Sequence, residues 1–187
     1  MHTDFVRLVH QPSTLLETPT PNQVKRIDID ACIMNFARPE LLDGTNKWYC
    51  EQCHQKTEAV KYTYLSREPE HLIIHLRRFK MDNTQRTKLT HIVKFPLGKF
   101  NFTKVFHQGS GLRNYERGNK YQLQSVVQHQ GNGDGGHYVT YCKDQGVKEW
   151  YQYDDSRVSK VHKDRKKEEI VNSNSYLLIY RRRDKKL

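Results

Sequence analysis

A two-residue alternation of apolar side chains constrains the fold of this chain more than any other feature. Leu72, Ile74 and Leu76 recur at every second position within 71–79, and Leu, Val, Gln and His residues are interleaved over 121–130. Because successive side chains of a strand point to opposite faces, this period is typical of half-buried β-strands. The sequence therefore predicts a fold built mostly of β-strands.

Turn residues between these segments predict antiparallel hairpins. Residues 81–84, Met-Asp-Asn-Thr, have the composition of a turn and follow the strand predicted over 71–79. A returning strand is predicted over 88–95, and Pro96 closes it because proline cannot donate to a strand ladder.

A second set of hairpins brings two chemically active residues together. The glycine-rich loop 131–136 precedes a strand at 138–142, whose partner is predicted at 150–153. His137 and Asp154 then lie at one end of adjacent antiparallel strands, so their side chains are expected to meet.

Helical signals are few and confined to the first third of the chain. Asp28 or Asp30 is a suitable N-cap for a short helix over 31–36, which Pro39 ends or restarts. The apolar segment 176–180 is predicted to be a strand that needs a sheet to cover it. The fold class expected is α+β, mostly antiparallel β.

The length of 187 residues fits one domain, and 35% hydrophobic with 11% aromatic residues indicates a folded chain. Residues 1–23 contain Pro12, Pro19 and Pro21, so we expect a linker or a truncated edge there. No apolar run approaches the roughly 20 residues of a membrane-spanning helix, so no membrane partner is expected. The expected location is cytoplasmic, nuclear or both.

The formal net charge is +11, from 32 basic and 21 acidic residues. Much of the excess lies in the runs 163–167 and 181–186, which include a basic tail at 183–187. A solvated basic face is the simplest interpretation. Nucleic-acid binding is a weaker alternative, because these runs contain no aromatic side chains on which bases would stack.

His137 with Asp154 or Asp155 is the strongest candidate for a catalytic site. A histidine base needs a carboxylate to hold one tautomer and to stabilise the imidazolium that forms. Gly135 and Gly136 before it would allow an extended substrate backbone to approach closely. The competing interpretation is an ordinary hairpin with a surface histidine and two turn acids.

Cys50 and Cys53 have the Cys-x-x-Cys spacing of a metal-binding knuckle, and the four cysteines fit a reducing compartment better than a disulfide scaffold. Zinc is possible at this incomplete site, to which His54 would add a third ligand. A plain turn with free thiols is the simpler state. Cys50-x-x-Cys53-His54 also spells a c-type haem motif, which lacks the export signal that haem attachment requires.

Several motifs, taken in order, resemble those of the ubiquitin-specific proteases, and the resemblance covers about 24–182. They are Leu72 to Phe79, Lys88 with Val93 to Pro96, Tyr121 to His129, Gly135 to Tyr141, Trp150 to Val158, and Ser175 to Tyr180. The resemblance implies the palm and part of the fingers of a papain-like cysteine protease fold, the C-terminal part of its catalytic domain, with the thumb and the Cys box missing.

The resemblance also implies cysteine-dependent hydrolysis of isopeptide bonds at the C-terminal glycine of ubiquitin, with no cofactor required. His137 would be the general base and Asp154 its orienting acid, with Asp155 second in rank. The Gly-Gly end of ubiquitin would thread past Gly135, Gly136 and Tyr138. Ubiquitin and ubiquitinated proteins are the partners expected.

None of the four cysteines stands in the Gly-x-Thr-Cys setting that the family uses for its nucleophile. We therefore expect a segment absent from this sequence to supply that cysteine. The alternative is a catalytically inactive ubiquitin-binding or scaffold protein.

Overall fold

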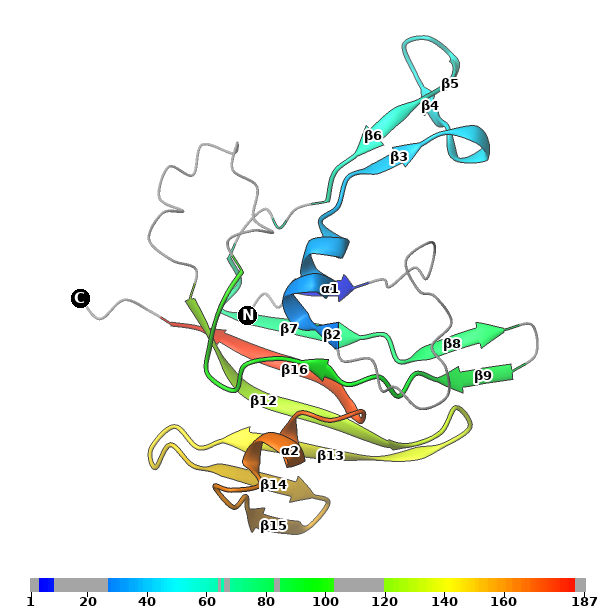
Figure 1. Ribbon diagram of the computed structural model, residues 1–187. Coiled ribbons are helices and arrows are strands. Elements are labelled where there is room, and N and C mark those ends of the chain that lie inside the picture. The colour runs from blue at the N-terminus through cyan, green and yellow to red at the C-terminus, as the bar shows by residue number, and fades with distance from the viewer. Residues whose placement is uncertain are drawn as a thin grey trace.

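One eight-stranded sheet forms the body of the protein (Figure 1). The computed structural model describes residues 4–8, 27–63, 65, 68–82, 85–102 and 120–183. In spatial order the sheet contains β1 (Asp4–Leu8), β7 (His71–Leu76), β16 (Ser175–Arg182), β12 (Lys120–Gly131), β13 (Gly136–Lys143), β14 (Trp150–Asp154) and β15 (Arg157–Lys160), and β11 (Lys99–Asn101) also pairs with β12.

All neighbours in this sheet are antiparallel except β1 and β7, which are parallel. Two helices are described, α1 (Ile29–Phe36) and α2 (Lys166–Ile170), with one 3-10 turn, η1 (Gly44–Asn46). The predicted α+β class, mostly antiparallel, is confirmed. None of the described helices is long and apolar enough to cross a membrane.

Four two-stranded ribbons complete the fold. Two of them form an arm that extends away from the sheet in Figure 1, and a third lies beside the turn that joins β12 to β13. The ribbons are β3 (Glu40–Leu42) with β6 (Ala59–Lys61) and β4 (Trp48–Cys50) with β5 (Gln55–Thr57) in the arm, β8 (Phe79–Asp82) with β9 (Gln85–Lys88), and β2 (Ile27–Asp28) with β10 (Val93–Lys94).

The core lies around the three central strands and beneath both helices. Leu123 and Val126 of β12 and Leu178 of β16 have no exposed surface, and Ile29 of α1 and Ile170 of α2 pack into the same cluster. Burial of each such side chain stabilises the fold by about 1.5–3 kcal/mol. The apolar segment 176–180 thus receives the cover it was predicted to need.

The predicted helix is confirmed and begins at Ile29. Asp28 is its N-cap, and Oδ1 of Asp28 accepts a hydrogen bond of 2.8 Å from the backbone N–H of Ala31. The helix ends before Pro39 and does not restart, because Glu40–Leu42 pairs as β3 with β6.

The strand predicted over 88–95 is wrong. The strand that completes the hairpin is β9, which pairs with β8 and ends at Lys88. Further along this segment, only Val93–Lys94 forms a strand. Between them the buried guanidinium of Arg78 donates to the carbonyls of Leu89 and His91, so these carbonyls need no neighbouring strand.

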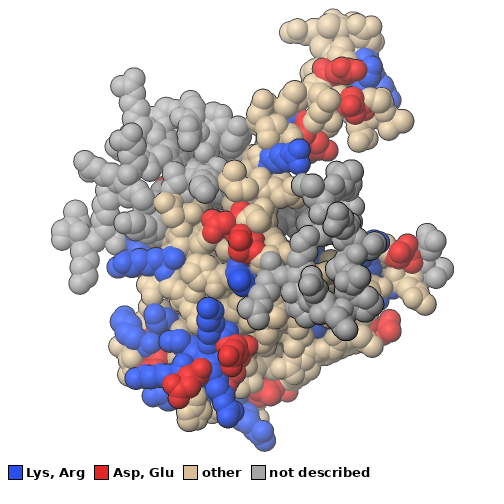
Figure 2. All heavy atoms as spheres, viewed as in Figure 1, with Lys and Arg blue, Asp and Glu red and all other residues tan. Residues whose placement is uncertain are grey.

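Other segments differ from the prediction or fall outside it. Asp4–Leu8, inside the predicted linker, is strand β1 on the edge beside β7, and the three prolines of 1–23 come after it. Helix α2 and strand β15 were not predicted, and Lys and Arg side chains gather around α2 in Figure 2. The segment 107–119, whose glycines and polar residues have the composition of a loop, lies outside the described residues.

Candidate functional site

The register of β13 and β14 brings His137 and Asp154 together. Thr140 pairs with Tyr153, which sets Asp154 level with Val139. His137 lies two residues before Val139 and therefore points to the same face of the sheet. Diagonal neighbours of this kind are within reach of long or aromatic side chains. The predicted meeting of the two side chains is confirmed.

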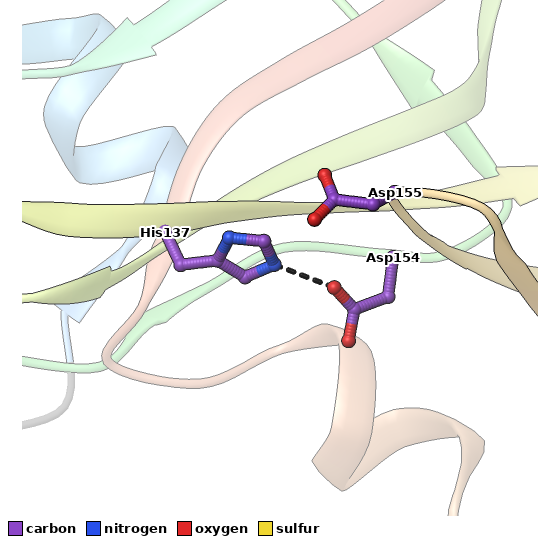
Figure 3. A group of neighbouring side chains, drawn as sticks. All are labelled: His137, Asp154 and Asp155. Carbon is purple, nitrogen blue, oxygen red and sulfur yellow. Dashed lines mark hydrogen bonds and ion pairs between the residues drawn. The ribbon is translucent and has the colours of Figure 1, made fainter.

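A short hydrogen bond joins the two residues. Nε2 of His137 lies 2.5 Å from Oδ1 of Asp154 (Figure 3). This bond is the largest cause of a pKa of His137 above its ordinary value. Desolvation, the next largest effect, lowers that pKa, and the charges of Asp154 and Asp155 raise it. The other ring nitrogen, Nδ1, faces away from Asp154 in Figure 3 and is the atom that can exchange a proton with a reacting group.

Asp155 lies in the two-residue loop that joins β14 to β15, where Asp154 pairs with Arg157. Its φ of 50° is in the left-handed region, which aspartate tolerates better than most residues. Its carboxylate lies beside the His137 ring in Figure 3 but shares no dashed bond with it. Asp155 therefore contributes charge to the imidazolium, while Asp154 contributes the bond.

His137, Asp154 and Asp155 are the one group of three or more His, Cys, Asp or Glu side chains in the described part of the chain whose ligand atoms lie within 4.8 Å of one another. No cysteine belongs to it. A histidine bonded to a carboxylate in this way is able to act as a base.

The three residues predicted to line the substrate path flank His137 and differ in their surroundings. Gly135 has open space where a side chain would stand, whereas a Cβ on Gly136 would lie 2.3 Å from Nε2 of His129. Tyr138 is 53% exposed, and its ring centroid lies 4.9 Å from that of His129. Gly135 and Tyr138 are thus open to a ligand, whereas the fold requires glycine at position 136 because a Cβ there would overlap His129.

An aromatic cluster under this strand end was missed by the sequence reasoning. The buried His129 contacts Phe79 and Tyr176 as well as Tyr138, with centroid separations of 5.3 and 6.1 Å for the first two. Tyr176 also lies 6.1 Å from Tyr138. Four separate strands, β8, β12, β13 and β16, supply these rings, and no local pattern in the sequence points to their meeting.

Cys50 and Cys53 lie at the far end of the arm, at the turn between β4 and β5. The N–H groups of Cys53 and Gln52 and the Cys53 thiol all bond the Cys50 sulfur and lower the pKa of that thiol. A lowered pKa favours the thiolate, which is the form of cysteine that binds metal. His54 does not complete a metal site, because no described third ligand groups with the two sulfurs.

Comparisons with known proteins give the family of this chain. A family model described as ubiquitin carboxyl-terminal hydrolase matches residues 40–180. A probable ubiquitin carboxyl-terminal hydrolase of Acanthamoeba polyphaga mimivirus is 33% identical over 169 residues, which are 90% of this chain and 34% of that protein. Ubiquitin carboxyl-terminal hydrolase 12 of Saccharomyces cerevisiae is 34% identical over 161 residues, 86% of this chain and 12% of that protein.

A solved structure has the same fold. A chain of the SAGA Ubp8/Sgf11/Sus1/Sgf73 DUB module bound to ubiquitin aldehyde superimposes with a TM-score of 0.68 at 26% identity, over 85% of this chain and 35% of that chain. The present chain thus spans about a third or less of the relatives it matches. The family model covers most of its length, from the arm through the last strand, and includes His137 and Asp154. The chain belongs to the ubiquitin carboxyl-terminal hydrolase family.

Proposed function

We propose that this chain is the part of a cysteine-type deubiquitinase that carries the general base and its orienting acid. The observation that carries the proposal is the hydrogen bond of 2.5 Å between Nε2 of His137 and Oδ1 of Asp154. A histidine held this way keeps Nδ1 turned toward a reacting group, and its imidazolium form is stabilised.

The nucleophile is proposed to be a cysteine outside the 187 residues printed here. Cys142 lies five residues after His137 on β13, which places it about 16 Å away at the usual rise of a strand. Burial raises the pKa of the Cys142 and Cys32 thiols, so neither is poised as a thiolate. Cys50 and Cys53 lie on the arm, away from β13 in Figure 1.

The chemistry follows from these roles. The thiolate attacks the isopeptide carbonyl, and the C–N bond breaks as His137 gives a proton to the leaving lysine amine. Water then attacks the thioester while His137 takes a proton from it, which frees the ubiquitin carboxylate and restores the thiol. Asp154 stabilises the charged imidazole at both stages. No cofactor takes part in this sequence of steps.

Ubiquitin is the proposed ligand, and the related module is described as bound to ubiquitin aldehyde. Its glycine-ended tail would pass Gly135, which has room for a ligand, and Tyr138, whose ring is exposed. Trp48, Tyr49 and Val60 on the arm are each at least half exposed and offer apolar surface to a protein partner.

Zinc at Cys50 and Cys53 is a separate proposal. Two thiolates supply half of a tetrahedral structural site, so stoichiometric zinc requires two ligands from outside the described residues. The lowered pKa of the Cys50 thiol supports such a role for the pair, and the proposed catalytic steps do not use this site.

A second candidate function is ubiquitin binding without catalysis. The absence of any cysteine from the group around His137, Asp154 and Asp155 in the described residues favours it. The two functions predict the same affinity for ubiquitin and differ in turnover alone.

The experiment uses the protein expressed from its own gene and a ubiquitin carrying a fluorescent amide at its C-terminus. The deubiquitinase proposal is supported if the unsubstituted protein hydrolyses this substrate and His137→Ala does not, while calorimetry shows the same ubiquitin affinity for both. Cys142→Ser is the matched control and should retain full activity. Binding without hydrolysis in the unsubstituted protein supports the second candidate, and full activity of His137→Ala removes His137 from its role.

A further inference from the structure

Strand β12 extends beyond the strand that pairs with it on one side. The ladder between β12 and β16 stops where Gln128 meets Ser175, the first residue of β16. The N–H of His129 still finds the carbonyl of Asn174 at 2.9 Å. From there to Gly131, no strand among the described residues pairs with β12 on this side.

The ammonium of Lys88 takes the place of the absent strand. Nζ of Lys88 donates to the carbonyl of His129 at 2.5 Å, to the carbonyl of Gly131 at 3.0 Å and to Oδ1 of Asn174 at 3.1 Å. An ammonium has three donors, so all of them are used. The bonds are charge-assisted and therefore stronger than ordinary ladder bonds.

The carbonyls that Lys88 bonds belong to the part of β12 that pairs with the start of β13, where His137 lies. On its other edge β12 pairs His129 with Tyr138, Gln130 with His137 and Gly131 with Gly136. Movement of the 129–131 carbonyls would therefore carry His137 with it. The Nε2 to Asp154 distance depends on this position, because Asp154 comes from a different strand, β14.

The side chain of Lys88 is partly shielded from solvent, unlike that of a flexible surface lysine. Desolvation and the neighbouring Arg78 charge lower the pKa of Lys88, so the ammonium is partly withdrawn from water. The same hairpin touches the glycine-rich loop at a second point, where a Cβ on Gly133 would lie 2.2 Å from the carbonyl oxygen of Arg86. The β8–β9 ribbon and the loop before His137 form one packed unit.

We propose that Lys88 is a positioning residue for His137, acting through the carbonyls of His129 and Gly131. This inference rests on the proposed role of His137 as general base. The hydrogen bonds described for Lys88 go to β12 and Asn174 and none goes to His137, so its contribution is to keep the end of β12 in the register that the His137 to Asp154 bond requires.

The test compares Lys88→Met with Lys80→Met on the 187-residue chain. Lys80 is the matched control, since it lies on the paired strand β8, forms an exposed ion pair with Asp82 at 3.6 Å and does not bond β12. The readouts are amide hydrogen exchange along β12 and β13 and the NMR titration of the His137 ring.

In Lys88→Met, the amides of the pairs from His129 to Gly131 should exchange about tenfold faster or more, since bonds to a charged donor are lost. Amides around Val126 should keep their rates, and the titration midpoint of His137 should fall. Lys80→Met should change none of these. Asn174→Ala, which removes one acceptor, is the milder second variant and should give a smaller effect of the same pattern.

Uniformly faster exchange with an unchanged His137 titration would make Lys88 merely structural and overturn the proposal, as would no change at all. In the protein expressed from its own gene, Lys88→Met should lower kcat at least tenfold with little change in KM, and Lys88→Arg should recover part of the loss. Full activity of His137→Ala would instead sink the proposed function, which the exchange pattern alone does not test.

Discussion

Gly136 packs directly against the imidazole of His129, so closely that a Cβ on residue 136 would lie 2.3 Å from Nε2 of His129 and 2.5 Å from the carbonyl oxygen of Gln130. No real Cβ tolerates such distances. The glycine before the candidate base is therefore required by the fold, and the buried histidine below it sets how near the two strands can approach.

This contact predicts opposite outcomes for two neighbouring glycines. Gly136→Ala should destabilise the protein by about 1–3 kcal/mol, because a methyl group is forced into a filled site. Gly135→Ala, with nothing within 4 Å of its Cβ position, should change stability by less than about 0.5 kcal/mol. Urea unfolding of both variants measures the difference. Equal stability of the two would mean that His129 moves aside without cost.

The titration of His137 should depend on Asp154 more than on Asp155. Asp154→Asn should lower the pKa of His137 toward its ordinary value, since the hydrogen bond to Asp154 is the largest cause of the rise, and Asp155→Asn should lower it less. NMR of the imidazole protons follows both. A larger effect of Asp155→Asn would reverse the two roles.

The same shift makes a small part of the stability depend on pH. The folded-state pKa of His137 is raised, so the pair with Asp154 stabilises the fold at pH values below the ordinary imidazole pKa. That contribution is lost as the pH rises through the raised value. Thermal unfolding at a series of pH values should show the loss in the wild-type chain, and His137→Gln should not show it.

Hydrolysis by the protein expressed from its own gene should respond to the same two carboxylates. Asp154→Ala should reduce kcat about 100-fold or more, because the base loses its orientation and the imidazolium its counter-charge. Asp155→Ala, which removes charge but no hydrogen bond, should reduce kcat by a smaller factor. The measurement is the kcat of both variants on the fluorescent ubiquitin amide. Equal losses of kcat would count against Asp154 as the principal orienting acid.

Arg78 should be a major contributor to stability even though it is charged. It is 4% exposed, and its Nε donates to the carbonyl of Ser175 at 3.0 Å. Its Nη1 donates to the carbonyls of Leu89 and His91. Burial lowers the pKa of Arg78 to about 10. Arg78→Met should cost about 1–3 kcal/mol or more, since buried carbonyls lose their donor.

Arg77 is the control for this prediction. It is the adjacent residue of the same type and is exposed, so Arg77→Met should change the free energy of unfolding by less than about 0.5 kcal/mol. Denaturant midpoints of the two variants make the comparison. Similar losses would show that charge in general, and not the bonds of Arg78, is responsible.

Local patterns in the sequence were enough to predict the two hairpins that join β12 to β13 and β13 to β14, and with them the meeting of His137 and Asp154. Three local patterns, each a few residues long, together place His137 beside Asp154. They are the alternation in 121–130, the glycine-rich turn and the aromatic strand at 150–153. These features depend on side-chain period and turn chemistry, which are properties of neighbours in the chain.

Contacts between distant segments required the tertiary structure. The prediction of a strand over 88–95 failed because the Arg78 guanidinium, ten or more residues earlier, takes the carbonyls of Leu89 and His91. Likewise no local signal shows that Lys88 bonds carbonyls more than forty residues away or that His129 lies under Gly136. The period of a segment determines which face of a strand is apolar, but the register and the polar groups of remote segments decide what that strand meets.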